Sequence, residues 1–120
     1  MRVLICGSVD FRWNFVIYER MKKFDKDTVI IEGEARGADT IARNCAERMG
    51  LQVLKFPADW NKYGKAAGPI RNKQMIDEGK PDLVLAFYSE ESKSRGTKNT
   101  VTQALKAGIP VETFDASKEL

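Results

Sequence analysis

Residues 28–50 read TVIIEGEARGADTIARNCAERMG, and this stretch decides the fold. Its first four residues are all β-branched, which is typical of a short buried strand. Its second half predicts a helix, because apolar residues recur at helical spacing and Gly50 follows them as a natural C-cap. These apolar residues are Ile41, Ala42, Cys45, Ala46 and Met49. A strand, a short turn and a helix in this order form the repeating unit of an α/β fold.

The same alternation continues along the rest of the chain. Short apolar runs predict strands over residues 2–6, 28–31, 52–56, 82–87 and 111–114. Helical patterns lie between them: residues 11–24 with Asp10 as N-cap, the helix before Gly50, a helix from about Pro69, and one from Thr97 that stops before Pro110. This order predicts an α/β fold, a Rossmann-like three-layer sandwich with a mainly parallel sheet of about five strands.

The composition is that of a soluble globular protein. Hydrophobic residues make up 42% of the chain and charged residues 31%, whereas disordered chains are poorer in apolar residues. No Pro-, Gly- or Ser-rich stretch divides the sequence, so we expect a single domain over residues 1–120. No apolar run approaches the ~20 residues that span a bilayer, and the first residues predict a strand and not an export signal. We therefore expect a cytoplasmic protein with no membrane partner.

The chain contains no histidine, which excludes Ser-His and Cys-His mechanisms and most zinc chemistry. Cys6 and Cys45 lack a second ligand at metal-binding spacing and are interpreted as reduced core thiols. We expect no metal site and no cofactor, so any catalysis would rest on carboxylates, lysine, arginine or the substrate. The net charge of +3 is spread over the whole chain and predicts no dense basic face, so nucleic acid is not expected as a partner.

Ligands of such sheets bind beyond the carboxyl ends of the strands, so the loops after the strands are the candidate site. After the first strand, a Gly-Ser pair allows close backbone approach to a ligand, or forms only a tight turn. After the second strand, two glycines bracket an arginine just before a helix, as in a phosphate-binding turn or an ordinary turn with a solvated arginine. The candidate ligand-binding residues of these loops are Gly7, Ser8, Gly33, Arg36, Gly37 and Asp39.

A long loop follows the third strand, and loops of this length in small domains are more often functional than idle. Its candidate ligand-binding residues are Asp59, Trp60, Arg71 and Asn72. Trp60 would stack on a base, with core packing as the alternative. Arg71 follows Pro69 by two residues, so we expect it in the first turn of a helix, where its guanidinium would face an anion at the helix N-terminus.

After the fourth strand, Gly96 and Thr97 open a helix whose free N–H groups would hold phosphate. Thr97 is also expected as an N-cap, and capping is compatible with phosphate binding. Because parallel strands end at one edge of a sheet, we expect Gly7, Gly33 and Gly96 to cluster there.

Taken together, these loops resemble the YspA/YpsA-related branch of the SLOG superfamily over nearly the whole chain. The resemblance rests on Gly7-Ser8, Gly33-x-Ala35-Arg36-Gly37-Ala38-Asp39, Asp59-Trp60, Gly64-Lys65-x-Ala67-Gly68-Pro69-Ile70-Arg71-Asn72-x-x-Met75, Gly96-Thr97 and Ala107-Gly108-Ile109-Pro110-Val111. It implies a Rossmann-like sensor or processor of a nucleotide or nucleotide derivative, of a kind found in phages and bacteria, with no single established reaction.

The same superfamily holds the LOG-type phosphoribohydrolases, which cleave the N-glycosidic bond of nucleoside monophosphates. Arg71 is similar to their helix arginine, and Gly96-Thr97 to the GT of their PGGxGTxxE loop. Thr100 stands in the place of their glutamate, and Pro-Gly-Gly is absent. A carboxylate is needed to stabilise the oxocarbenium-like charge or to activate water, so these departures argue against LOG-type hydrolysis.

Two smaller departures also concern charge. Val9 stands where the branch usually has arginine, and Glu34 where it usually has glycine. If the chain is an enzyme, the catalytic candidates are Glu34, Asp39 and Arg71, with Asp59 as a further carboxylate.

Three functions follow in order of preference. The first is a binding module for a nucleotide-like small molecule, a sensor or sequestering protein for a signal such as an ADP-ribose derivative or a cyclic nucleotide. The second is a LOG-like hydrolase of nucleoside 5′-monophosphates, and the third a single-stranded DNA binder. The sequence leaves open whether the chain forms a homo-oligomer.

Overall fold

Strands and helices alternate along the chain in the computed structural model, which describes residues 1–119. The strands are β1 (Arg2–Gly7), β2 (Val29–Glu32), β3 (Gln52–Lys55), β4 (Leu83–Tyr88) and β5 (Val111–Asp115). The helices are α1 (Asn14–Met21), α2 (Ala38–Met49), α3 (Trp60–Tyr63), α4 (Ala67–Asp77), α5 (Arg95–Lys106) and α6 (Ala116–Glu119), with short 3₁₀ turns at Gly64–Ala66 and Glu91–Lys93. Each strand lies within one residue of its expected bounds at either end, because the apolar runs are short and clearly interrupted.

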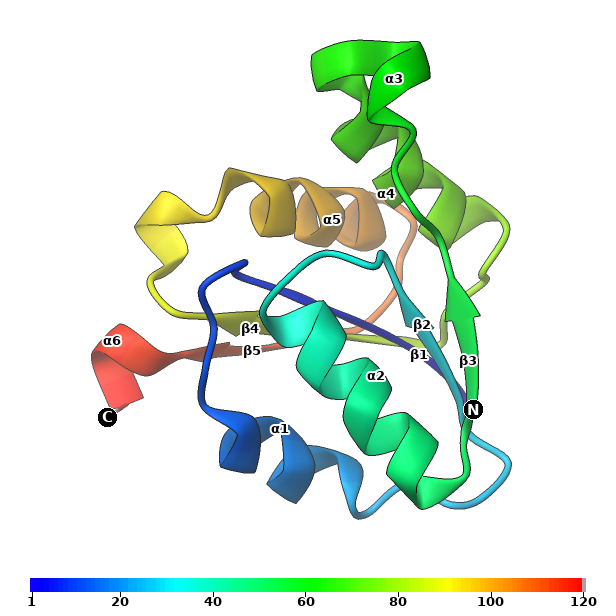
Figure 1. Cartoon of the computed structure of the whole chain (residues 1–120), viewed down its shortest axis with the longest axis vertical. Coiled ribbons are helices and arrows are strands. Elements are labelled where there is room, and N and C mark those ends of the chain that lie inside the picture. Colours follow the sequence, from blue (N-terminus) through cyan, green and yellow to red (C-terminus); the bar gives the residue numbers. More distant parts are fainter. Residues whose placement is uncertain (120) are drawn as a thin grey trace.

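The five strands form one sheet in the order β3-β2-β1-β4-β5, and every neighbouring pair is parallel. Helices α1 and α2 lie on one side of this sheet and α4 and α5 on the other (Figure 1). The prediction of an α/β, Rossmann-like sandwich with a parallel sheet of about five strands is therefore confirmed. Strand order reverses between β1 and β4, so the loops after these two strands diverge to opposite faces and leave a crevice between them.

The sheet is buried on both faces, which explains why its central strands are apolar without alternation. Val3 and Ile5 of β1 pack in a cluster with α1 and α2, whereas Leu4 and Cys6 pack in a second cluster with α4 and α5. All six residues of β4 are buried. No helix in the described part of the chain is long and apolar enough to cross a membrane.

Three helix starts differ from expectation. Helix α1 begins at Asn14, and Asp10 is not its N-cap. The cause is Phe11, which is buried against Trp13 and Phe87 and holds the preceding residues in a non-helical loop. Helix α4 begins two residues before Pro69, and α5 begins at Arg95, so Thr97 is its third residue and not its N-cap.

The turn after β1 packs directly on the start of α2. Gly37, the residue before α2, has φ +75°, and a Cβ there would overlap the carbonyl oxygen of Ser8. A Cβ at Gly7 would overlap the carbonyl oxygen of Phe87 in β4. A side chain at either position would push the neighbouring carbonyl away, so both must be glycine. These two glycines therefore set how closely β1, α2 and β4 approach one another.

We predict that Gly37→Ala lowers the free energy of unfolding by about 3 kcal/mol, because it combines a positive φ with the overlap on Ser8. Gly50→Ala is the matched control: Gly50 has the same φ of +75° but open space around its Cβ position, so that variant should lose only about 1 kcal/mol. Urea denaturation of both variants measures the difference. Equal losses of unfolding free energy in the two variants would show that the overlap with Ser8 does not contribute to the destabilisation.

Candidate functional site

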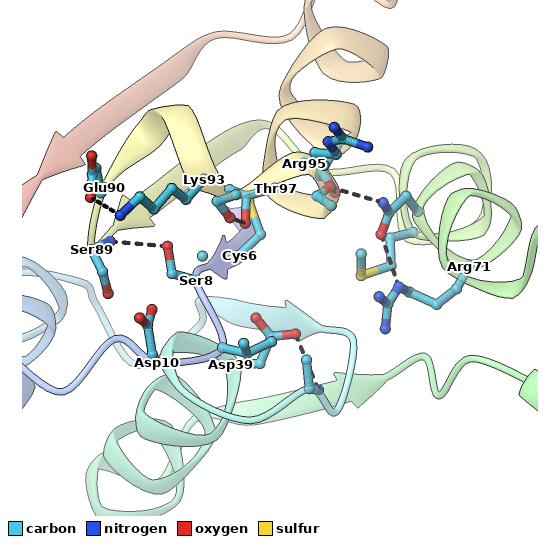
Figure 2. Close-up of a pocket in the computed structure, with 18 residues that line it drawn as sticks. Cys6, Ser8, Asp10, Asp39, Arg71, Ser89, Glu90, Lys93, Arg95 and Thr97 are labelled. Carbon is cyan, nitrogen blue, oxygen red and sulfur yellow. Dashed lines mark hydrogen bonds and ion pairs between the residues drawn. The ribbon is translucent and has the colours of Figure 1, made fainter. Parts of the chain in front are cut away.

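A cavity of about 480 Å³ lies at the crevice where strand order reverses (Figure 2). Its walls come from the end of β1 and the loop after it, the start of α2, one side of α4, and the loop from β4 into α5. The two switch-point loops are joined, because the Ser8 amide donates to the Phe87 carbonyl at 2.9 Å and the Ser89 amide donates to Ser8 Oγ at 2.9 Å. These hydrogen bonds hold the two loops that form the cavity in fixed positions.

The structure brings most of the expected site residues to this cavity. Those that line it are Gly7, Ser8, Asp39, Arg71, Asn72, Gly96 and Thr97. Gly33 lies just behind the wall, since its amide donates to Asp39 and its carbonyl accepts from Arg71. Gly7, Gly33 and Gly96 therefore lie at the same edge of the sheet.

Five of the residues singled out from the sequence do not line the cavity: Glu34, Arg36, Gly37, Asp59 and Trp60. Glu34 lies 3.9 Å from Arg43 in an ion pair, and Arg36 is exposed. Asp59 caps α3 by accepting from the Lys62 amide at 3.0 Å. Trp60 belongs to α3, the helix at the top of Figure 1, and its ring lies near Gly68. The residue is 59% exposed, so the alternative of core packing is wrong.

Asp39 is the buried carboxylate of the cavity, with 4% of its surface exposed. Its Oδ2 accepts from the amides of Gly33 at 3.0 Å and Ala35 at 3.4 Å, which fixes the turn between β2 and α2. Burial raises the pKa of the Asp39 carboxyl to about 6, against the opposing effects of the Gly33 amide and the positive charge of Arg71. A carboxyl with such a pKa can hold or release a proton near neutral pH.

Arg71 bridges two walls of the cavity. It is the fifth residue of α4, so it lies in the second turn and not the first, because the helix starts before Pro69. Its Nη1 donates to the Gly33 carbonyl at 2.5 Å and its Nε to Asn72 Oδ1 at 2.8 Å. Asn72 Nδ2 in turn donates to Asn99 Oδ1 at 3.1 Å and to the Gly96 carbonyl at 3.3 Å. This chain of hydrogen bonds ties β2, α4 and α5 together around the site.

The start of α5 forms the basic wall of the cavity. Lys93 and Arg95 line it, together with the hydroxyls of Ser94 and Thr97, whose oxygens are 2.8 Å apart. No side chain caps the start of α5, which leaves its first N–H groups without a side-chain acceptor. Lys93 also lies 3.2 Å from Glu90. An anion at this wall would meet a helix N-terminus, Arg95, and Lys93 with its partner Glu90.

Sequence analysis missed several lining residues, chiefly Asp10, Ser89, Glu90, Lys93, Ser94 and Arg95. Most belong to the loop after β4, of which only the end had been singled out. These residues could have been predicted only if the first and fourth strands were known to be neighbours in the sheet. That pairing is a tertiary contact, and no local sequence pattern indicates it.

A model of the YspA, cpYpsA-related SLOG family matches residues 1–63. The Gene 61 protein of Mycobacterium phage D29 is 37% identical over 122 residues, covering 94% of this chain and 95% of that protein. The chain belongs to the YspA, cpYpsA-related SLOG family. The resemblance drawn from its motifs is thus confirmed.

A solved structure, the DNA processing protein A (DprA) of Streptococcus pneumoniae, shares the fold of this SLOG chain. The two superpose with a TM-score of 0.74 at 21% identity, over 93% of this chain and 49% of that one. This chain therefore spans about half the length of DprA, and the likeness at this identity shows the fold alone.

Within residues 1–119, no group of three or more His, Cys, Asp or Glu side chains is placed to hold a metal ion. Cys6 lines the cavity, but burial raises the pKa of its thiol well above the usual range, which keeps it protonated and unreactive. Polar chemistry at the site thus rests on Asp39, Arg71 and the wall at α5.

Glu32 gives a pH-dependent stability that can be measured. The side chain is fully buried at the end of β2; Oε2 accepts from the Glu34 amide, and Oε1 has no partner in residues 1–119. Burial raises the pKa of Glu32 from 4.5 to about 7, so the folded chain binds its proton more tightly than the unfolded chain does. Its contribution to stability is full below pH 4.5 and is lost as the pH rises through 7.

We predict that the melting temperature of the wild type falls between pH 5 and pH 8, and that Glu32→Gln falls less, because glutamine cannot ionise. The difference in pH dependence should reach up to about 3 kcal/mol. Glu112→Gln is the control, since Glu112 is a partly exposed carboxyl whose pKa is lowered by Arg20. Parallel curves for wild type and Glu32→Gln would show that Glu32 does not titrate in this range.

Proposed function

We propose that this protein binds a nucleotide or nucleotide-derived phosphorylated ligand in the cavity between β1 and β4, as a sensor or sequestering module. The observation that carries the proposal is the start of α5, where a helix N-terminus without a side-chain cap, Lys93 and Arg95 line a cavity at the switch point of a parallel sheet. Membership of the SLOG family supports the same ligand class. ADP-ribose-type and cyclic nucleotide signals are the ligands to test first.

The phosphate would lie against the start of α5. Lys93, Arg95 and the Thr97 hydroxyl supply charge and hydrogen bonds there, and Gly96 has open space where a Cβ would be. The opposite wall carries Asp10 and Asp39, which repel an anion. The charge distribution of the cavity thus favours one orientation of a phosphorylated ligand.

The second candidate function, hydrolysis of the N-glycosidic bond of a nucleoside monophosphate, gains support from one placement. Of the three replacement carboxylates considered, Asp39 lines the cavity with Arg71, whereas Glu34 and Asp59 do not. The raised pKa of Asp39, about 6, suits a general acid or base. Hydrolysis would therefore depend on Asp39, with Arg71 opposite it.

We further propose that residues 1–120 act as one SLOG-type nucleotide-binding domain in the cytoplasm. The fold shared with a DNA processing protein makes single-stranded DNA a third ligand to test, against the expectation from net charge. The exposed aromatic and basic residues of the α3 segment, Trp60, Lys62, Tyr63 and Lys65, are where stacking on a strand would occur.

One screen separates the three functions. Thermal shift with nucleoside monophosphates, ADP-ribose, cyclic nucleotides and a single-stranded oligonucleotide should show stabilisation by the phosphorylated small molecules. Chromatography of the same mixtures after incubation should show no released base. Released base that disappears in Asp39→Asn would establish the hydrolase instead, and stabilisation by the oligonucleotide alone would establish the DNA binder.

For the best nucleotide of the screen, we predict that Arg95→Ala weakens binding by about ten- to a hundredfold, because a charge-assisted contact contributes roughly 1.5–3 kcal/mol. Lys98→Ala removes the same charge from an exposed position of the same helix outside the cavity, and should change affinity less than threefold. Titration calorimetry measures both. Equal effects of the two variants would indicate long-range charge and no contact at α5.

Arg71→Ala should weaken binding of that nucleotide by a similar ten- to a hundredfold, and Arg71→Lys should restore only part, because a point charge cannot reproduce the guanidinium fork. Arg71→Ala should also lose about 1 kcal/mol of stability, since the Gly33 carbonyl loses its donor. Calorimetry and urea denaturation give the two numbers. Unchanged affinity in a folded variant would mean that Arg71 does not contact the ligand and only holds Gly33 and Asn72 in place.

A further inference from the structure

The cavity has two opposite poles. Figure 2 shows Lys93, Thr97 and Arg95 along one wall, and Asp10 and Asp39 along the other, with Ser8 between them. An anionic group fits the first pole, where Lys93 and Arg95 outnumber Glu90, the ion-pair partner of Lys93. The second pole offers negative oxygens, so whatever part of the ligand lies there must bring hydrogen-bond donors.

Asp39 has acceptor capacity that the protein leaves unused. Both backbone amides that bind it donate to Oδ2, and no donor among residues 1–119 reaches Oδ1. The residue is only 4% exposed, and it lines the cavity. Oδ1 is not itself fully buried: it opens onto the cavity, where a ligand or water can donate to it.

A neighbouring hydroxyl also lacks a hydrogen-bond partner among residues 1–119, and unlike Oδ1 of Asp39 it is fully buried. Ser89 lines the cavity, and its Oγ is buried without a hydrogen-bond partner in the described chain. A serine hydroxyl both donates and accepts, as a sugar hydroxyl does. Asp10, exposed at the mouth of the same wall, adds a second carboxylate.

The lining also argues against a base at this pole. No aromatic side chain lines the cavity within residues 1–119, whereas bases are usually held by stacking on aromatic rings. Carboxylates beside serine hydroxyls are instead the groups that accept from vicinal hydroxyls, as acidic residues do for ribose in dinucleotide sites.

We propose that Asp39 and Asp10 accept hydrogen bonds from the vicinal hydroxyls of a ribose whose phosphate lies at the start of α5, so that the site selects ribonucleotides over 2′-deoxyribonucleotides. This inference rests on the proposed function. Loss of the 2′-hydroxyl removes the donor to a carboxylate oxygen of a nearly enclosed residue, and sites built to hydrogen-bond a hydroxyl reject the analogue that lacks it.

The test is titration calorimetry with four pairs of nucleoside 5′-monophosphates, each pair differing only in the 2′-hydroxyl, and with ribose 5-phosphate as a base-free probe. In the wild type, the ribonucleotide of the best pair should bind about ten- to a hundredfold tighter than its deoxy partner. Asp39→Asn should reduce this ratio to about threefold or less, because the Gly33 and Ala35 amides hold the one remaining acceptor oxygen and the charge-assisted acceptor for the hydroxyl is lost.

Asp10→Asn is a second variant in case Asp39→Asn fails to fold, since Asp10 is exposed and makes no hydrogen bond to the described chain. It should also reduce the ratio of ribonucleotide to deoxyribonucleotide affinity. Asp27→Asn, at an exposed carboxylate away from the cavity, should leave the ratio unchanged. Equal binding of both members of each pair by the wild type would overturn this inference and leave the proposed function standing. No binding of any probe would also overturn this inference, and the proposed function falls with it only if ADP-ribose and the cyclic nucleotides give no thermal shift either.

Discussion

The pairing of β1 with β4 is the contact on which the rest of the structure depends. Its register runs from Val3 with Leu83 to Gly7 with Phe87, and it joins two βα halves that wind in opposite directions. Because the halves diverge at this seam, their loops cannot fill the space beyond it. The crevice is therefore a consequence of topology, and the glycine at position 7 keeps the seam closed by letting the Phe87 carbonyl approach.

The sequence was informative wherever local chemistry decides structure. Strands buried on both faces must be apolar throughout, so their positions could be predicted, and Gly50 ends α2 with φ +75° as expected of a C-cap. Tertiary packing overrode the local pattern elsewhere: Phe11 continues the apolar spacing of α1 but is buried against Phe87 outside the helix. The wall formed by Lys93 and Arg95 could not be predicted, since charged residues in a polar loop carry no signal until the neighbouring strand is known.

The buried carboxyls at the end of β2 and the start of α2 are costly for stability. Glu32 has an oxygen with no partner among residues 1–119, and Asp39 is nearly enclosed, although a chain selected only for stability would place apolar or fully paired groups there. Proteins depart from such rules mainly at functional sites. The charge of Arg71 and the amide of Gly33 offset part of the cost at Asp39, which links the support of the turn to the polarity of the cavity.

The hydrogen bonds that run from the Gly33 carbonyl through Arg71 and Asn72 to Asn99 also bear on binding kinetics. They join β2, α4 and α5 before any ligand arrives, so the distance between the two walls of the crevice is set in the free protein. A ligand then meets a preformed opening and needs no closure step, and its association rate should vary little between related compounds. Selectivity at such a site is expressed in residence time: well-matched ligands leave slowly, and poorly matched ones enter as fast and leave sooner.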